Sequence, residues 1–198
     1  MPIRVMVRVL IACLGCLTTG LAGVAGADTG GGANNVVIAQ NTADGRFFSR
    51  SGVMVAQNPG ETVANSNLAI AESTDCAGCH TVSVAMQVVV VENESPNDFR
   101  PANAATAVNG NCTSCQTYAF AYQYIVQPGT PVTLSASAQQ GIAGIRLRVR
   151  DAAASGAPFY ELKAVLDGLC NELAGVVTSD LGLTDARPCT DSSDQKQQ

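Results

Sequence analysis

The chain has 198 residues and a formal net charge of −5, from 11 basic and 16 acidic residues. An acidic chain with few, scattered basic residues lacks the electrostatic footprint of a nucleic-acid-binding protein. The sequence also contains no metalloprotease, phosphate-loop or serine-hydrolase motif, so we expect a protein without catalytic activity.

The first 27 residues predict a secretory signal peptide. Arg4 and Arg8 precede an apolar stretch, Val9–Val24, which ends in the small-residue cleavage site Ala-Gly-Ala at 25–27. Cleavage removes two positive charges and changes the net charge from −5 to about −7. We therefore expect a secreted or extracytoplasmic protein associated with the cell surface. It would contact the membrane only if the signal segment were retained as an anchor.

A stretch with a C-x-x-C motif occurs twice, at residues 67–91 and 103–127. The two copies align without a gap at an offset of 36 residues, as between positions 76 and 112. This register indicates an internal duplication. The identical pairs include Asn67 and Asn103, Cys76 and Cys112, Cys79 and Cys115, Thr81 and Thr117, Ala85 and Ala121, and Gln87 and Gln123.

The chain before the motifs predicts strands, and each repeat predicts a helix followed by a strand. Two runs, Val36–Gln40 and Arg46–Gln57, flank the turn cluster Asn41–Gly45 and predict a hairpin or two neighbouring strands. The first halves of the repeats, Thr62–Ser73 and Asn103–Val108, are rich in Ala and favour helices. After the cysteines, Val, Thr, Tyr, Phe and Ile favour strands. Each repeat is therefore predicted as a helix–turn–strand unit with its C-x-x-C motif at the turn.

The strand predicted in each repeat has two different faces. We expect an α+β fold with a small mixed sheet and helices over one face. In the first repeat, Val82, Val84, Met86, Val88 and Val90 share one face, and Thr81, Ser83, Ala85, Gln87 and Val89 share the other. In the second repeat, Tyr118, Phe120, Tyr122, Tyr124 and Val126 take the positions of the first set.

The last third of the chain predicts a C-terminal helical hairpin. Thr133–Ala154 has apolar residues on one helical face, although Arg146–Arg150 also alternates like a strand. Pro158–Thr178 is the clearest helix, because its apolar residues recur at steps of three and four. The polar tail from Thr190 predicts disorder. The expected organisation is a signal peptide (1–27), a duplicated C-x-x-C domain (28–130), a helical hairpin (131–180) and a tail (181–198).

Removal of the signal peptide leaves six cysteines. An even number in an exported chain indicates disulfides, because the compartment is oxidising, but sequence alone leaves their connectivity open. We expect the four motif cysteines to pair within each motif or between the motifs, and the last two to pair with each other. The disulfide candidates are Cys76, Cys79, Cys112, Cys115, Cys170 and Cys189.

The segment CAGCH also fits the pattern for covalent attachment of haem c. Cys76 and Cys79 would form the thioether links, and His80 would bind the iron. The duplicate motif has Gln116 where the imidazole would be needed. This difference argues against a haem role shared by both copies.

Two further uses of the four motif cysteines are open. They offer four thiolate ligands for a structural zinc ion, although the motifs are far apart and the compartment is oxidising. A dithiol–disulfide redox centre would need a thiol pKa lowered by a helix N-terminus or a basic neighbour. The acidic Asp75 and the helices predicted before each pair argue against it. We expect no cofactor, with haem c and zinc as the alternatives.

The segments CAGCHTVSVAMQVVVV and CTSCQTYAFAYQYIVQ resemble a group of actinobacterial exported sequences labelled peptide zinc metalloprotease proteins. In that group, related segments follow a membrane-embedded site-2-type protease region. The likeness runs from Val36 to about Val177, and His80 stands where the group more often has glutamine. The chain has neither the zinc-binding motif nor the membrane helices of such a protease, so no catalytic residue carries over.

These observations predict a non-catalytic, disulfide-stabilised module that is secreted or held in the cell envelope. We expect it to bind a protein or peptide, with a cell-envelope protein or a membrane protease as its partner. The alternative is a haem c or thiol redox protein that uses Cys76, Cys79 and His80.

Overall fold

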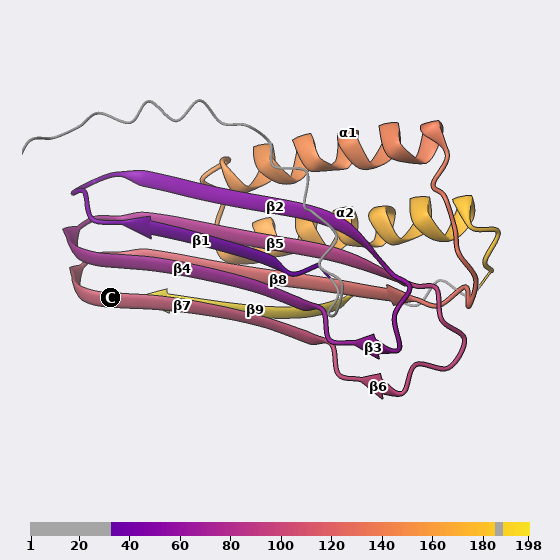
Figure 1. Cartoon of the computed structure of the whole chain (residues 1–198). Coiled ribbons are helices and arrows are strands. Elements are labelled where there is room, and N and C mark those ends of the chain that lie inside the picture. The colour runs from indigo at the N-terminus through magenta and orange to yellow at the C-terminus, as the bar shows by residue number, and fades with distance from the viewer. Residues whose placement is uncertain (1–32, 185–187) are drawn as a thin grey trace, which may run out of the picture.

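The computed structural model describes residues 33–184 and 188–198, so the signal peptide predicted at 1–27 lies outside the described residues. The described chain forms a parallel β-helix of three rungs followed by a helical hairpin (Figure 1). Its elements are β1 (Asn35–Asn41), β2 (Phe47–Asn58), β3 (Thr62–Val63), β4 (Ser66–Ala77), β5 (His80–Val91), β6 (Asp98–Phe99), β7 (Ala102–Thr113), β8 (Gln116–Val126), α1 (Ala136–Ala153), α2 (Phe159–Asp180) and β9 (Thr190–Gln197).

Each rung contributes one strand to each of two facing sheets. Sheet A has the order β1-β4-β7, and sheet B has the order β2-β5-β8-β9. All pairs are parallel except β8 with β9, so sheet B is mixed. The short strands β3 and β6 pair at the corner where one rung leads to the next. The expected α+β fold with a C-terminal helical hairpin is confirmed.

Small side chains fill the space between the two sheets, which lets the sheets lie close together. The predicted alternation of the repeat strands is confirmed: the face with Thr81, Ser83 and Ala85 points between the sheets, and the other face packs under the helices. The buried alanines of this interior are Ala69, Ala71, Ala85, Ala107, Ala119 and Ala121.

The helical hairpin covers the outer face of sheet B. Leu166 and Leu173 of α2 and Ile145 of α1 are fully buried against Phe120 and the other outward-facing residues of β5 and β8. Burial of this apolar surface is the main stabilising contribution here. Both predicted helices are confirmed, within two or three residues of the predicted ends.

The predicted helices at Thr62–Ser73 and Asn103–Val108 are wrong, because these segments are strands of sheet A. Alanine favours helix in isolation. Here, however, every second residue must be small enough to fit between two closely spaced sheets, and the neighbouring rung supplies the hydrogen bonds. Packing in the sheet therefore overrides the local preference.

Both strands predicted at Val36–Gln40 and Arg46–Gln57 are confirmed, but they do not pair with each other as a hairpin. β1 pairs with β4 and β2 pairs with β5, so these strands form a first rung that continues the repeat without cysteines. Asn35 is in register with Asn67. The tail predicted as disordered from Thr190 is instead β9, which pairs antiparallel with β8.

The first rung differs from the other two at its inward-facing positions. Phe48 is in register with Thr81, and Arg50 with Ser83. A Cβ at Gly52, on the same face, would meet Val37 Cγ2 at 2.7 Å, which shows that this face points toward β1. Phe48 is half-buried and Arg50 exposed, so these large side chains lie over the open end of the β-helix.

Candidate functional site

The C-x-x-C motifs form two similar turns stacked one above the other. Asp75 and Asn111 precede the first cysteine of each motif and have φ of 53° and 48°. Asn and Asp tolerate this left-handed conformation better than most residues. Asn111 Nδ2 donates to Asp75 Oδ1 at 2.7 Å, which joins the turns. The backbone therefore holds Cys76 directly beside Cys112.

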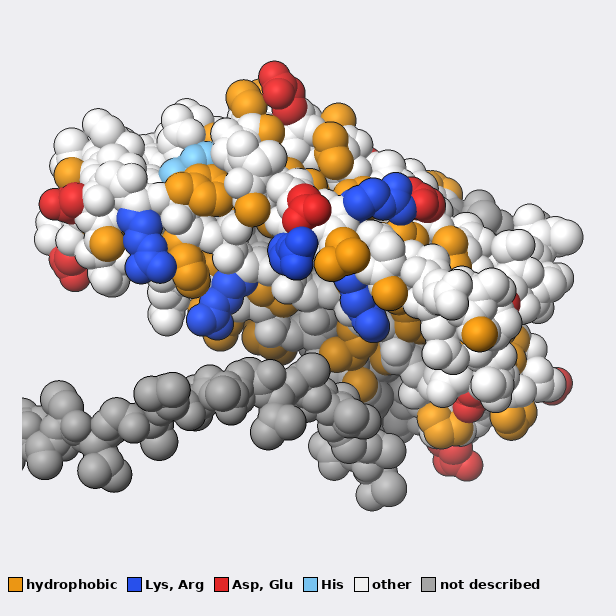
Figure 2. All heavy atoms as spheres, turned by 90° about the horizontal axis from the view of Figure 1, so that it is seen from above, with side chains coloured by type: hydrophobic (Ala, Val, Ile, Leu, Met, Phe, Trp, Pro, Cys, Tyr) orange, Lys and Arg blue, Asp and Glu red, His pale blue; other side chains and the backbone are white. Residues whose placement is uncertain are grey.

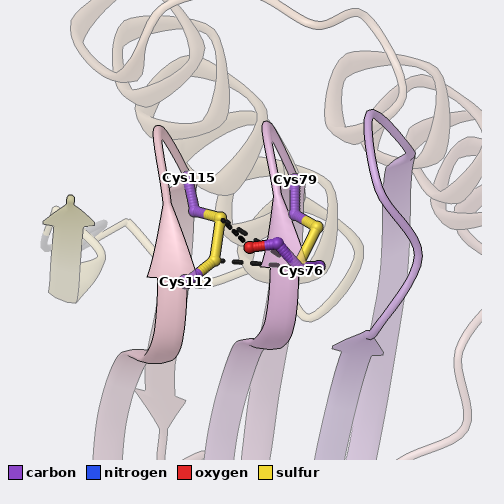
Figure 3. A group of neighbouring side chains, drawn as sticks. All are labelled: Cys76, Cys79, Cys112 and Cys115. Carbon is purple, nitrogen blue, oxygen red and sulfur yellow. Dashed lines mark hydrogen bonds between the residues drawn. A yellow bond between two sulfur atoms is a disulfide. The ribbon is translucent and has the colours of Figure 1, made fainter.

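The four motif cysteines form one buried sulfur cluster (Figure 3). Each motif closes on itself, as Cys76–Cys79 and Cys112–Cys115, which is one of the two arrangements predicted. Cys76 Sγ lies 3.6 Å from Cys112 Sγ and 4.0 Å from Cys115 Sγ. All four Sγ atoms lie within 4.8 Å of one another. The two disulfides therefore stack in van der Waals contact.

Zinc would require both disulfides to be open. A tetrahedral four-thiolate zinc site has Zn–S distances of about 2.3 Å, hence sulfur separations of about 3.8 Å, which this cluster can reach. The surroundings favour uncharged sulfur, however. Cys79 Sγ lies 3.2 Å from the carbonyl oxygen of Ala43, and Cys115 Sγ lies 3.6 Å from that of Cys76. Carbonyl oxygens this close would repel the negative charge of a thiolate, so the cluster suits disulfides better than thiolates.

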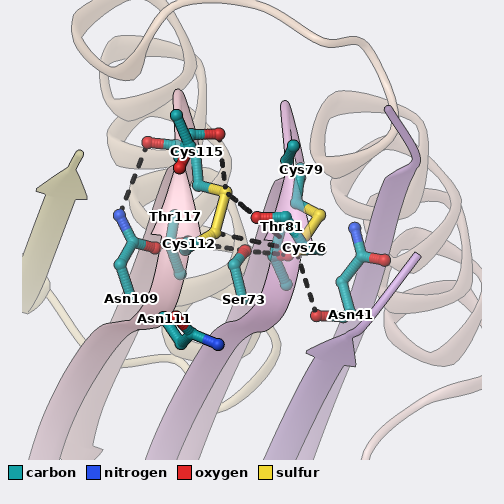
Figure 4. Close-up of a disulfide and its surroundings, with 12 residues drawn as sticks. Asn41, Ser73, Cys76, Cys79, Thr81, Asn109, Asn111, Cys112, Cys115 and Thr117 are labelled. Carbon is teal, nitrogen blue, oxygen red and sulfur yellow. Dashed lines mark hydrogen bonds between the residues drawn. A yellow bond between two sulfur atoms is a disulfide. The ribbon is translucent and has the colours of Figure 1, made fainter. Parts of the chain in front are cut away.

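A buried hydroxyl network lies beneath the cluster (Figure 4). Ser73 Oγ is 2.7 Å from Thr81 Oγ1 and 2.8 Å from Thr117 Oγ1. Thr117 donates to Asn109 Oδ1 at 2.5 Å, and Asn109 Nδ2 donates to the carbonyl of Cys115 at 3.4 Å. The network satisfies the polar groups at this end of the interior. It explains why the motif reads C-x-x-C-x-T in both repeats.

His80 lies on the opposite side of its strand from the sulfur cluster. Its ring packs edge-to-face against Phe47 and Tyr118, with centroid distances of 4.8 and 5.0 Å. Nε2 is buried without a hydrogen-bond partner, and burial lowers the pKa of His80. The structure thus brings Cys76 and Cys79 together but directs His80 away from them, which does not favour the haem arrangement.

The disulfide predicted between the last two cysteines also forms. Cys170 is fully buried on α2 and is bonded to Cys189, just before β9. The backbone N–H of Cys189 also donates to Asn171 Oδ1 of the same helix at 3.2 Å. This disulfide fastens the final strand to the helical hairpin.

The outer face of sheet A is a further candidate site, which the sequence interpretation missed because part of it was assigned to helices. Val36, Ile38 and Val108 are 52%, 40% and 39% exposed, and no described residue forms a layer over them. The available signal was that apolar residues occupy both faces of this strand, with Val36 and Ile38 on one face and Val37 and Ala39 on the other. In register, the rows of this face are Val36, Leu68 and Ala104; Ile38, Ile70 and Thr106; and Gln40, Glu72 and Val108.

Comparison of the chain with protein-family models, with curated proteins and with solved structures found no match. Neither helix in the described part of the chain is long and apolar enough to cross a bilayer.

Proposed function

We propose that this chain is a non-catalytic, exported module that binds another protein of the cell envelope through the outer face of sheet A. One observation carries the proposal, namely the contrast between the two sheets. The helical hairpin buries the outer face of sheet B, whereas the outer face of sheet A lies open among the described residues. Parallel sheets are usually covered on both faces.

The chemistry of the open face indicates an apolar protein surface as its partner. Of the nine side chains in its three central rows, only Glu72 is charged, and Gln40 Nε2 donates to its Oε2 at 2.7 Å. The other two of these rows contain only aliphatic or small side chains. An exposed patch of this kind marks an interaction site more often than isolated surface apolar residues do.

The disulfides support an extracytoplasmic location for this module. Three disulfides join all six cysteines of the described chain. Disulfides persist in oxidising compartments. A membrane-associated protease of the cell envelope is the partner that we propose from the sequence resemblance.

Site-specific photocrosslinking tests this function. A photoreactive residue at Ile38 should capture one dominant partner in intact cells of the source organism. The same residue at Val165, which is 52% exposed on α2, provides the matched control. The captured protein is then purified and titrated with the mature chain.

We expect Ile38→Lys or Ile70→Lys to abolish binding of the purified partner, while Val165→Lys leaves it intact. Thermal unfolding of each variant checks that the β-helix is retained. Equal binding by the sheet A variants and the control, or equal crosslinking at both positions, contradicts the proposal.

A further inference from the structure

The edge strand β2 presents unpaired main-chain groups. Among the described residues only β5 pairs with β2. The carbonyl of Arg46 accepts from His80 N at 3.0 Å on the β5 side, whereas the carbonyl of Val53 points the other way and accepts from Arg146 Nε at 3.1 Å. Because main-chain groups alternate along a strand, those of Ser49 and Ser51 also point toward the unpaired edge. This edge can therefore accept another strand.

Three arginines lie along the same edge without a carboxylate partner. The guanidinium groups of Arg46 and Arg50 lie 4.9 and 5.6 Å from the centroid of the Phe48 ring. Arg146 reaches the edge from α1 through its bond to Val53. None of the three is within 4.0 Å of a carboxylate in the described part of the chain. Their charges are available to an anionic ligand.

Several basic side chains lie on this side of the protein. Figure 2, which views the molecule from the side of α1 and β2, shows Lys and Arg side chains spread across this face, with apolar and acidic side chains between them. The chain as a whole has a formal net charge of −5. The arginines without a carboxylate partner favour an acidic ligand and steer its approach.

A cavity continues from the edge between β2 and α1. Its volume is about 470 Å³, and Arg146 lies at its boundary. Val55 and Ile142 supply apolar walls, while Gln57 and Gln139 supply polar groups. A ligand that carries an apolar side chain next to an acidic one would fit this cavity.

We propose that an extended, acidic segment of another protein adds to β2 as an extra strand. Arg46 and Arg50 are four residues apart, about 13 Å along an extended chain. Acidic residues four positions apart on one face of the added strand can therefore meet both arginines. Main-chain hydrogen bonds would supply affinity, and alternate side chains would supply specificity. This site is separate from the outer face of sheet A, and its partner need not be the same protein.

Binding of defined peptides to the mature chain tests this inference. The probe is a short fluorescent peptide of alternating threonine and glutamate, and its glutamine counterpart is the control. We expect the glutamate peptide to bind about tenfold more tightly, since close charge pairs at an interface reach this magnitude. High salt should reduce the difference. Amide NMR shifts should change at Ser49 and Ser51.

Charge-reversed variants locate the bound peptide on the protein. Arg50→Glu and, independently, Arg46→Glu should each weaken the glutamate peptide about tenfold. Arg100→Glu, on the far side beside Asp98, and Ile70→Lys, on sheet A, should leave it unchanged. Methylation of alternate peptide amides should abolish binding. The inference is overturned if the glutamate and glutamine peptides bind equally well. It is also overturned if the methylated peptide binds fully, or if inorganic polyphosphate binds fully to the same residues.

Discussion

The side-chain amides of Asn67 and Asn103 are hydrogen-bonded to each other across two rungs, from Nδ2 of Asn67 to Oδ1 of Asn103, at 2.8 Å. Asn35 donates to Asn67 Oδ1, also at 2.8 Å, which extends the row to all three rungs. Asn67 Nδ2 also lies 3.0 Å from the carbonyl oxygen of Tyr122 on sheet B. One buried amide thus connects three rungs and two sheets.

Replacement of the central amide should therefore destabilise the fold more than its size suggests. Asn67→Leu removes these bonds and leaves buried polar partners unsatisfied, so we expect the free energy of unfolding to fall by about 2–4 kcal/mol. Urea unfolding measures this change in the free energy of unfolding. Asn97→Leu is the control, because Asn97 is exposed and its side chain donates to Glu61 at the surface. Similar losses for both variants would show that the row is unimportant.

The closely packed interior should reject a larger side chain. Ala121 is fully buried between the sheets, so Ala121→Leu must separate them or distort their strands. We expect a loss of about 1–3 kcal/mol or more in unfolding free energy. Ala104→Leu, on the exposed face of sheet A, should have little effect. If thermal melts showed Ala121→Leu to be tolerated equally well, the interior would have room for larger side chains.

The Cys170–Cys189 disulfide should matter most for β9. It closes a sequence separation of 19 residues, for which loop entropy predicts a stabilisation of about 3 kcal/mol. The double variant to alanine should lose a comparable amount, and the amides of Thr190–Gln197 should exchange faster with deuterium. Removal of Cys76–Cys79, which spans a separation of only 3, should cost less and leave exchange in β9 unchanged. The reverse order would contradict this prediction.

Stability should decrease as the pH falls through the titration of His80. Burial lowers its pKa in the folded state from the usual 6.5, so the unfolded chain binds the proton more readily. The stabilisation is complete above pH 6.5 and is lost as the pH falls toward the folded pKa. His80→Gln, which copies Gln116 of the next rung, should flatten the pH profile of the unfolding free energy between about pH 5 and 7. An unchanged profile would assign the pH dependence to other groups.

The sequence was sufficient to predict the outward and inward faces of the strand after each C-x-x-C motif, and the final helices. These features depend on local periodicity, as in the stripe around Leu166 and Leu173, or on identity between copies. The expected pairing of Cys170 with Cys189 is present in the structure.

The first rung and the strands of sheet A depended on contacts that no local pattern reveals. The first rung lacks cysteines, and its turn from Asn41 to Phe47 is one residue shorter than the turn from Ser73 to His80. The gapless comparison therefore missed it. The polar strand β9 has no apolar residue. Its pairing depends on β8 and on Asp194, whose Oδ2 accepts from Ala107 N at 3.0 Å.

Phe48 and Arg50 are large side chains at the open end of the β-helix, and they prevent a further rung from stacking there. A fourth complete turn of the same kind would need small inward-facing residues beneath it, as Thr81 and Ser83 provide for the third. Two copies of the protein therefore cannot join end to end through this surface into a continuous fibre. A single added strand can still pair with the edge of β2. The same side chains that prevent further rungs from stacking are therefore compatible with the binding of one extended peptide segment.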